Sequence, residues 1–255
     1  MKIIGIIPAR MASTRFPGKP LKKILGIPMI GHVYQRCKLS KVLDQVYVAT
    51  CDSEIYDYIE SIRGKAIMTA NTHERAADRT AEALTNIEKL NDNEIDIVVM
   101  IQGDEPMIMP EMIELAVAPL INDQKVMVSN LMKKIESQKE WIDPNEVKVV
   151  VDINNNALYF SREPIPSSKK YQKKINAYKQ VCVMPFRREA LFSYMNLSPT
   201  YLENIESVDM NRFLEHGVSL KMVESKYQSF AVDTKEDLVF VEKTMKNDKL
   251  IKKYS

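Results

Sequence analysis

Residues 6–21 read IIPARMASTRFPGKPL, and this stretch decides how the start of the chain is interpreted. It begins inside the apolar run Lys2–Pro8, which has the length and the branched side chains of a buried strand. The loop that follows carries three cations, Arg10, Arg15 and Lys19, together with two prolines and a glycine. A basic loop at the end of a buried strand is typical of a site that holds an anion.

Short apolar runs alternate with helical patterns through the first half of the chain. Strands separated by helices predict right-handed βαβ crossovers and a parallel sheet, and continuous apolar runs predict strands buried on both faces. The expected strands are Lys2–Pro8, Gln45–Thr50, Ala66–Thr69 and Ile95–Gln102, and the expected helices are Pro28–Leu39, Ser53–Ile62 and Asp78–Leu90.

The alternation loosens after Pro110. The segment Pro164–Ala177 is polar, basic and poor in apolar residues, which predicts a loop or excursion and makes it a candidate for a mobile or oligomer-contacting insertion. We expect a single domain over residues 1–255 with a smaller lobe around 125–200. The expected strands are Val126–Met132, Glu146–Val151, Ala157–Ser161, Val181–Phe186 and Leu220–Val223, and the expected helices are Arg188–Tyr194, Tyr201–His216 (stopped by Gly217) and Thr234–Lys246, with Thr234 or Asp233 as N-cap.

The composition is that of a globular protein. The 255 residues are 45% hydrophobic and 27% charged, with a formal net charge of +2, which disfavours a general nucleic-acid surface. No apolar run reaches the length of a signal peptide or a membrane span. The three cysteines, Cys37, Cys51 and Cys182, lack metal-binding spacing and predict reduced thiols, so we expect a cytoplasmic protein without membrane or nucleic-acid partners.

The basic loop is a candidate phosphate site. Ligands of open α/β sheets bind outside the carboxyl ends of the strands. Backbone N–H groups around Gly18, with Arg10, Arg15 and Lys19, could neutralise a triphosphate there. Neither GxxxxGK[ST] nor GxGxxG is present, and an ordinary solvated loop is the alternative.

Two aspartates are candidate metal ligands. Asp104 lies in QGDEP, directly after the most apolar predicted strand, and Asp233 lies in AVDTKEDL, just before a predicted helix. Carboxylates near bound phosphates are typical ligands of Mg²⁺. The alternative for Asp233 is a helix N-cap without a further role.

Seven motifs occur in a characteristic order: PARMASTRFPGKPL, VATCDSEI, IQGDEPMI, DPNEVKVV, ALYFSRE, LENIESVDMNR and AVDTKEDL. Together they resemble the 3-deoxy-manno-octulosonate (Kdo) cytidylyltransferases from Ile6 to about Val241. The resemblance implies an α/β, Rossmann-like nucleotidyltransferase fold similar to glycosyltransferase A. Such a fold has a mixed sheet, helices on both faces and a smaller dimerisation lobe.

The resemblance also implies a reaction. CTP and Kdo give CMP-Kdo and pyrophosphate with Mg²⁺, in a homodimer that serves lipopolysaccharide and nucleotide-sugar biosynthesis. The implied catalytic residues are Lys19, Arg10, Asp104 and Asp233, the two aspartates being the metal ligands. The implied nucleotide-binding residues are Pro8, Ala9, Arg10, Ser13, Thr14, Arg15, Lys19, His73, Arg79 and Asp104, and the implied acceptor-binding residues are Arg75, Gln102, Gln180, Met184, Glu203 and Glu206.

The departures from the family pattern fall in the acceptor half. The family's His-x-Ser-Gly-Thr-Asp/Glu-Arg is HERAADR here, so Arg75, Ala76 and Ala77 replace the Ser-Gly-Thr centre. Gln180 and Met184 replace a His and a Tyr that face the sugar. Because lost hydrogen-bonding groups change specificity strongly, the acceptor is Kdo, a Kdo-like 2-keto-3-deoxy acid, or another acid or phosphorylated compound. Compensating residues that bind the same sugar and an inactive nucleotide-binding homologue are the remaining alternatives.

A transferase for sugar 1-phosphates is a further alternative. Those enzymes usually begin with a glycine-rich loop, whereas this chain has Pro8-Ala9-Arg10. The opening loop therefore favours the CMP-forming enzymes.

Overall fold

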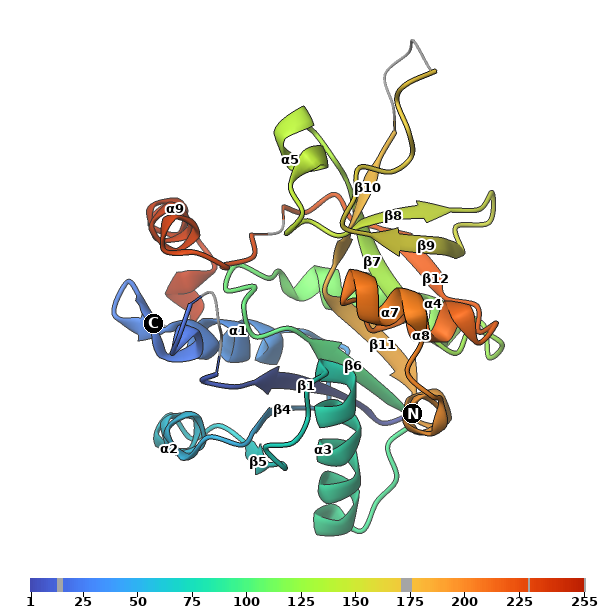
Figure 1. Cartoon of the computed structure of the whole chain (residues 1–255). Coiled ribbons are helices and arrows are strands. Elements are labelled where there is room, and N and C mark those ends of the chain that lie inside the picture. The colour runs from blue at the N-terminus through green and yellow to red at the C-terminus, as the bar shows by residue number, and fades with distance from the viewer. Residues whose placement is uncertain (13–15, 171–175, 229, 255) are drawn as a thin grey trace. The chain divides into compact units, whose positions relative to one another are not determined.

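The computed structural model describes residues 1–12, 16–170, 176–228 and 230–254 (Figure 1). The chain forms two compact units. The first unit consists of Met1–Glu114 and Ser229–Ser255, and the second of Leu115–Gln228. The lobe predicted around residues 125–200 lies within the second unit. No helix of the described ranges is both long and apolar enough to cross a membrane.

The first unit contains a parallel sheet in the order β6-β1-β4-β5. The strands β1, β4 and β6 are fully or mostly buried, as the continuous apolar runs predicted, whereas the short β5 is buried only at Ile67; all four predicted strands are confirmed. Their bounds are β1 Ile3–Ala9, β4 Gln45–Thr50, β5 Ala66–Met68 and β6 Ile97–Ile101.

Three helices connect these strands: α1 (Met29–Lys38), α2 (Ser53–Ser61) and α3 (Ala76–Asn91). All three predicted helices are confirmed. Right-handed crossovers place α1 and α2 on one face of the sheet and α3 on the other. The direction of winding changes between β1 and β6, so the loops after these two strands border the crevice in which such sheets bind ligands.

The C-terminal segment of the first unit carries α9 (Lys235–Met245). The Thr234 side chain accepts a hydrogen bond from the Asp237 N–H, and Asp237 accepts one from the Thr234 N–H. Thr234 is therefore the N-cap, and the alternative assignment of Asp233 to this role is wrong. Val232 and Val241 pack in a core cluster with Phe16, Ile24, Met29 and Met245.

Several elements of the first unit were not predicted. They are the hairpin of β2 (Lys23–Ile24) and β3 (Ile27–Pro28), and two 3₁₀ turns, η1 (Lys19–Leu21) and η2 (Ile251–Lys253). Helix α4 (Pro110–Asn122), also unpredicted, spans the sequence boundary between the two units.

The second unit contains a mixed sheet in the order β12-β7-β10-β8-β9, in which only β12 and β7 are parallel. The predicted strand Val181–Phe186 corresponds to β11 and shares only Val181 with β10, which was otherwise not predicted, and the predicted helix Tyr201–His216 is two helices, α7 and α8. Ser207, with φ 52°, ends the first of these helices, and Gly217, with φ 75°, follows the second. The elements are β7 Ser129–Lys134, α5 Gln138–Ile142, β8 Lys148–Val151, β9 Ala157–Ser161, β10 Tyr178–Val181, β11 Val183–Arg187, α6 Arg188–Asn196, α7 Tyr201–Glu206, α8 Met210–Glu215 and β12 Lys221–Glu224.

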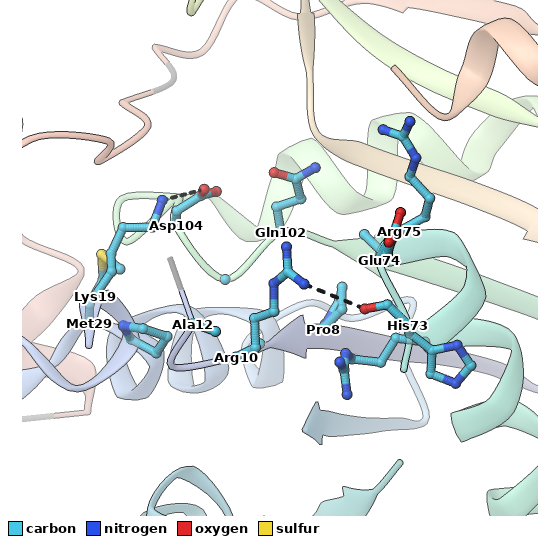
Figure 2. A pocket seen from close by; sticks show the side chains of 15 residues that line it. Pro8, Arg10, Ala12, Lys19, Met29, His73, Glu74, Arg75, Gln102 and Asp104 are labelled. Atoms are coloured by element: carbon cyan, nitrogen blue, oxygen red, sulfur yellow. Dashed lines mark hydrogen bonds and ion pairs between the residues drawn. The ribbon is translucent and has the colours of Figure 1, made fainter. Parts of the chain in front are cut away.

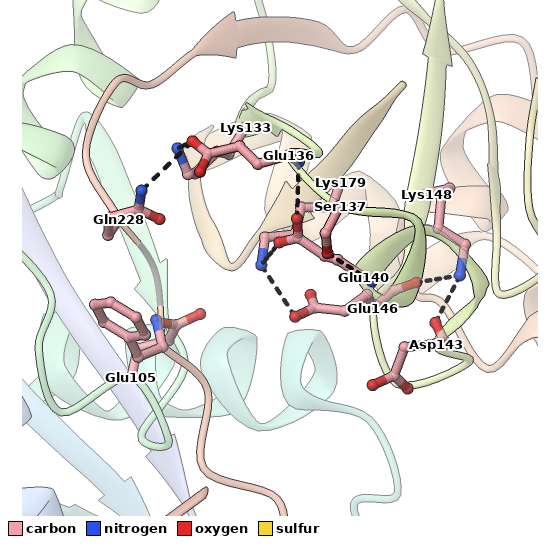
Figure 3. Close-up of polar contacts among 11 residues, drawn as sticks. Glu105, Lys133, Glu136, Ser137, Glu140, Asp143, Glu146, Lys148, Lys179 and Gln228 are labelled. Carbon is pink, nitrogen blue, oxygen red and sulfur yellow. Dashed lines mark hydrogen bonds and ion pairs between the residues drawn. The ribbon is translucent and has the colours of Figure 1, made fainter. Parts of the chain in front are cut away.

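Three buried lysines lie side by side on this sheet (Figure 3). Lys179 of β10 is paired in register with Lys133 of β7 and with Lys148 of β8. The Lys179 ammonium group contacts Glu140 at 2.7 Å and Glu146 at 3.0 Å. The buried positive charges are therefore compensated inside the unit.

The positive charge of buried Lys148 is stabilised by the dipoles of backbone carbonyl groups. Its ammonium group donates to the carbonyl oxygens of Asp143, Glu146 and Arg162, at 2.7, 2.6 and 2.5 Å. These bonds join the loop before β8 to the end of β9. The predicted excursion Pro164–Ala177 has no helix or strand in its described part, and residues 171–175 lie outside the described residues.

Candidate active site

The loops after β1 and β6 border a cavity of about 330 Å³ in the first unit (Figure 2). The lining contains four cationic side chains and two carboxylates, so the cavity is suited to a polyanion with a bound cation. Its lining residues are Pro8, Ala9, Arg10, Ala12, Lys19, Pro20, Met29, His73, Glu74, Arg75, Ala76, Arg79, Gln102, Gly103 and Asp104.

Lys19 lies between the two predicted metal carboxylates. Its Nζ is 2.8 Å from Asp104 Oδ2 and 3.2 Å from Asp233 Oδ1. Burial alone would lower the pKa of Lys19, but the charges and hydrogen bonds of Asp104 and Asp233 outweigh it and raise the pKa above the usual value. The lysine is therefore firmly protonated.

A tight turn presents Lys19 to the cavity. Gly18 has φ 69°, a left-handed conformation that glycine adopts without steric cost, and directly precedes η1. Its N–H donates to the Met11 carbonyl at 3.1 Å, and the Lys19 N–H donates to the Phe16 carbonyl at 3.2 Å. Pro20 in η1 restricts the backbone further.

Asp104 is placed by the close packing of Gly103. A β-carbon on Gly103 would lie 3.0 Å from Ile30 Cδ1 and 3.4 Å from the Pro8 carbonyl oxygen. The glycine thus lets the loop after β6 approach the end of β1. The cation of one loop and the carboxylate of the other meet for this reason.

Asp233 reaches the same point from the C-terminal segment. The N–H of Val232 donates to the Asp104 carbonyl at 2.9 Å, and the Val232 side chain is fully buried. On its other side, Asp233 is followed by the capped start of α9. These contacts hold Asp233 beside Lys19 from two directions.

The HERAADR segment lines another part of the cavity. His73 pairs with Glu82, whose carboxylate also accepts from the Ala70 N–H at 2.9 Å. Partial burial would raise the pKa of Glu82, but these contacts outweigh it and lower the pKa. The Arg10 side chain donates to the His73 carbonyl at 3.5 Å, which joins the opening loop to this segment.

Arg79 is the most buried cation of the cavity, with 3% of its surface exposed. Its Nη1 donates to Thr69 Oγ1 at 2.5 Å and to the Ala70 carbonyl at 3.2 Å. Its Nη2 is buried without a hydrogen-bond partner in the structure. Since a buried donor without a partner is costly, this atom is suited to an acceptor of a bound ligand.

The structure therefore brings most of the predicted nucleotide-binding residues together. Ser13, Thr14 and Arg15 lie outside the described residues. Arg75, at the N-cap position of α3, and Gln102 also line the cavity. Glu82 was missed in the sequence, although it lies three residues after Arg79 on a predicted helix and hence on the same side of it.

The other four predicted acceptor residues lie in the second unit and have partners there. Gln180 Nε2 donates to Asn130 Oδ1 at 2.6 Å and lies 3.7 Å from the sulfur of the buried Met184. Buried Glu203 forms an ion pair with Arg212 at 2.6 Å. Glu206 accepts from Tyr159, Ser161 and the Arg162 N–H at 2.6–2.8 Å. Their contact with an acceptor stays a prediction.

The Asp104 and Asp233 carboxylates are suited to a divalent cation. They already converge on one positive charge, the Lys19 ammonium group. No cluster of three or more His, Cys, Asp or Glu side chains suited to a metal occurs among the described residues. Two carboxylates are sufficient for Mg²⁺, which usually completes its octahedron with water and substrate phosphates.

A doubly wound sheet that brings a basic loop and paired carboxylates together at its switch point is typical of nucleotide-binding proteins. The sequence model of the family described as "Cytidylyltransferase" matches residues 4–225, and the chain belongs to this family.

Proteins with similar sequences support this family assignment. The 3-deoxy-manno-octulosonate cytidylyltransferase of Geotalea uraniireducens (strain Rf4) is 42% identical over 93% of this chain and 96% of its own length. That of Thermodesulfovibrio yellowstonii is 42% identical over 96% of this chain and 98% of its own length. The resemblance seen in the sequence motifs is thus confirmed.

Solved structures confirm the predicted fold class. A CMP:2-keto-3-deoxy-manno-octonic acid synthetase in complex with CTP aligns with a TM-score of 0.87 and 37% identity, covering 96% of this chain and 99% of that one. A 4-diphosphocytidyl-2C-methyl-D-erythritol synthase from Anaerococcus prevotii aligns with a TM-score of 0.63 and 15% identity, covering 96% of this chain and 99% of that one, and shares the fold alone.

Proposed function

We propose that this enzyme transfers the CMP group of CTP to Kdo or a Kdo-like 2-keto-3-deoxy acid and releases pyrophosphate. The observation that carries the proposal is the convergence of Asp104 and Asp233 on Lys19 beside a cationic cavity. The relatives named for Kdo cytidylyl transfer and the related enzyme complexed with CTP support the choice of both substrates.

Different residues of the cavity have different roles in the reaction. The acceptor hydroxyl oxygen forms a bond to the α-phosphorus of CTP and loses its proton to solvent, while the bond from the α-phosphorus to the oxygen of the β-phosphate breaks and pyrophosphate leaves. Lys19 and Arg10 stabilise the negative charge that develops on the leaving pyrophosphate. Arg79, with its buried donor, binds an acceptor atom of the nucleotide.

Magnesium is the proposed metal, held by Asp104 and Asp233. When bound there, Mg²⁺ supplies neutralisation of the triphosphate charge. Holding the substrates in line is the remaining task, and the turn at Gly18 and the close packing at Gly103 serve it.

A second candidate is cytidylyl transfer to a different acid or to a phosphorylated acceptor. The observation that favours it is Arg75, which lines the cavity in place of the family's serine. An additional guanidinium group suits an additional or displaced anionic group on the acceptor.

Pyrophosphate release from CTP with a panel of acceptors tests these proposals. We expect turnover with Kdo, and much slower turnover when ATP or GTP replaces CTP. Turnover only with a neutral sugar would overturn the acidic acceptor, and pyrophosphate release with a phosphorylated acid alone would favour the second candidate. The absence of turnover with every acceptor would favour the inactive homologue.

The remaining proposals follow from the family resemblance. They are a homodimer, which light scattering of the purified protein tests, and a cytoplasmic location, which stays a prediction. With Kdo as acceptor, the product serves lipopolysaccharide biosynthesis.

A further inference from the structure

We infer that Glu105 is a positioning residue that fixes Asp233 opposite Asp104. Glu105 directly follows Asp104 and has only 6% of its surface exposed. Its carboxylate accepts a hydrogen bond from a backbone N–H of the C-terminal segment, so we assign it a role through other residues. The inference deepens the proposed function and rests on it, because it concerns the carboxylate pair that we assign to the metal.

The carboxylate of Glu105 binds the backbone of the C-terminal segment. Its Oε2 accepts a hydrogen bond from the Phe230 N–H at 3.1 Å. Two residues further on, the Val232 N–H donates to the Asp104 carbonyl at 2.9 Å. The N–H groups of Phe230 and Val232, two residues apart, thus both bind residues 104–105, and the two bonds form a short ladder between residues 104–105 and 230–232.

The ladder has one rung that substitution can remove. The bond from Val232 joins two backbone groups and does not depend on side chains. The bond from Phe230 depends on the Glu105 carboxylate. The Phe230 N–H is partly buried and loses its acceptor when Glu105 is removed, so without Glu105 the start of this segment is expected to move toward other partners.

The position of Asp233 depends on this segment. Asp233 is the next residue after the second rung, and its carboxylate lies 3.2 Å from Lys19 Nζ. The segment enters the first unit at Ser229, and Phe230 is its first described residue. The Glu105 rung thus anchors the chain where it enters the unit, before Val232 and the capped α9 hold it further along.

Variants of Glu105 separate positioning from direct metal binding. Glu105→Gln keeps an acceptor oxygen in place, whereas Glu105→Ala removes it. Glu105→Asp keeps the charge but shortens the side chain, and therefore tests the hydrogen bond from the Phe230 N–H if the alanine variant does not fold. Glu242 is a matched control, because its Oε1 accepts from the Leu25 N–H, also at 3.1 Å, away from the aspartates.

Manganese(II), titrated in the presence of CTP and followed by electron paramagnetic resonance, is the probe. We expect Glu105→Ala and Glu105→Asp to weaken Mn²⁺ binding about tenfold, as supporting residues of metal sites typically do. Glu105→Gln and Glu242→Ala should stay close to wild type. Metal-free CTP binding, measured by calorimetry, should remain unchanged in all four variants.

Three results would overturn the inference. The first is a Mn²⁺ affinity of Glu105→Ala equal to that of wild type; Glu105→Asp takes the place of the alanine variant if the latter does not fold. The second is an equal loss of Mn²⁺ affinity in Glu105→Gln and Glu105→Ala, and the third is the same loss in Glu242→Ala. In each of these cases the wild-type site still binds the ion, so the proposed function stands. Absence of Mn²⁺ binding in the wild type would overturn the metal assignment and this inference together.

Discussion

Lys19 Nζ lies 2.8 Å from Asp104 Oδ2, although the two residues are 85 positions apart in the sequence. Lys19 comes from the loop after β1 and Asp104 from the loop after β6, and these strands are parallel neighbours. The ion pair therefore lies at the carboxyl ends of the central strands. The side chain of Lys19 is 12% exposed and that of Asp104 is 22% exposed, so water screens their attraction only in part.

Replacing Lys19 by Met is expected to lower kcat/KM by about 10²–10³, the usual cost of removing a group that stabilises developing charge. Without a divalent metal, the variant should also unfold at a lower temperature, because two carboxylates then face each other without their cation. Added Mg²⁺ should restore much of this loss. Pyrophosphate release and thermal unfolding measure the two effects.

Lys23→Met is the control for Lys19→Met, since Lys23 is an exposed lysine four residues further on. It should behave like wild type in both measurements. Near-normal turnover of Lys19→Met would contradict the role of Lys19 in the reaction.

Asp104→Asn and Asp233→Asn keep the size of each side chain and remove its charge. We expect each to lower turnover by about 10²–10³, while the free energy of unfolding changes little by comparison. The pKa of Lys19 should fall toward the usual value, because each carboxylate helps to raise it. Kinetics, urea unfolding and lysine titration by NMR test this.

The control for the aspartate variants is Asp96→Asn. Asp96 accepts from the Lys2 N–H at 2.5 Å, away from the cavity. If both site variants keep near-normal turnover at low Mg²⁺, the metal assignment is wrong.

Arg75 is expected to set the acceptor preference. Restoring Ser at position 75, Gly at 76 and Thr at 77, together with Gln180→His and Met184→Tyr, should raise kcat/KM for Kdo. Arg75→Ser alone should shift the ratio of kcat/KM by about tenfold toward Kdo and away from an acceptor with a further anionic group. This is the contribution of one charge-assisted hydrogen bond. An unchanged ratio would mean that Arg75 has no part in choosing the acceptor.

His32 predicts a fall in stability under mildly acidic conditions. The fully buried ring lies between the Ile24 carbonyl, at 2.8 Å, and the Tyr254 hydroxyl, at 3.0 Å. Burial, helped by the charge of nearby Arg36, lowers the pKa of His32 below its ordinary value of 6.5, although its bonds to backbone carbonyls oppose the shift. The folded state therefore holds the ring neutral.

The sign of the pH effect follows from this lowered pKa. The stabilisation is fully present above 6.5 and is lost as the pH falls through the folded-state pKa, because the unfolded chain then binds more protons. Urea unfolding of wild type and His32→Asn from about pH 7.5 to about pH 5.5 measures this pH dependence of the free energy of unfolding. The variant should be less stable at neutral pH but show a flatter dependence, and parallel curves would contradict the prediction.

The buried strands of the first unit were predictable because their signal is local. Continuous apolar runs marked β1, β4, β5 and β6, and glycine and polar residues marked their ends. The second unit was less predictable, because most of its strands are antiparallel and Lys133, Lys148 and Lys179 are buried in the sheet. Lysines in a sequence predict an exposed surface, and only their partners in the folded unit make burial tolerable.

The sequence by itself determined the family and the basic loop after the first strand and predicted Asp104 and Asp233 as metal ligands, since these inferences depend on motifs and on the order of local elements. Only the tertiary structure decided that Asp233, 214 residues from Lys19, shares its ammonium group with Asp104. It also decided that Glu105 accepts the Phe230 N–H and that Arg79, which lines the cavity, has a buried donor without a hydrogen-bond partner. Periodicity and propensity extend over a few residues, whereas such contacts form when packing brings distant segments of the chain together.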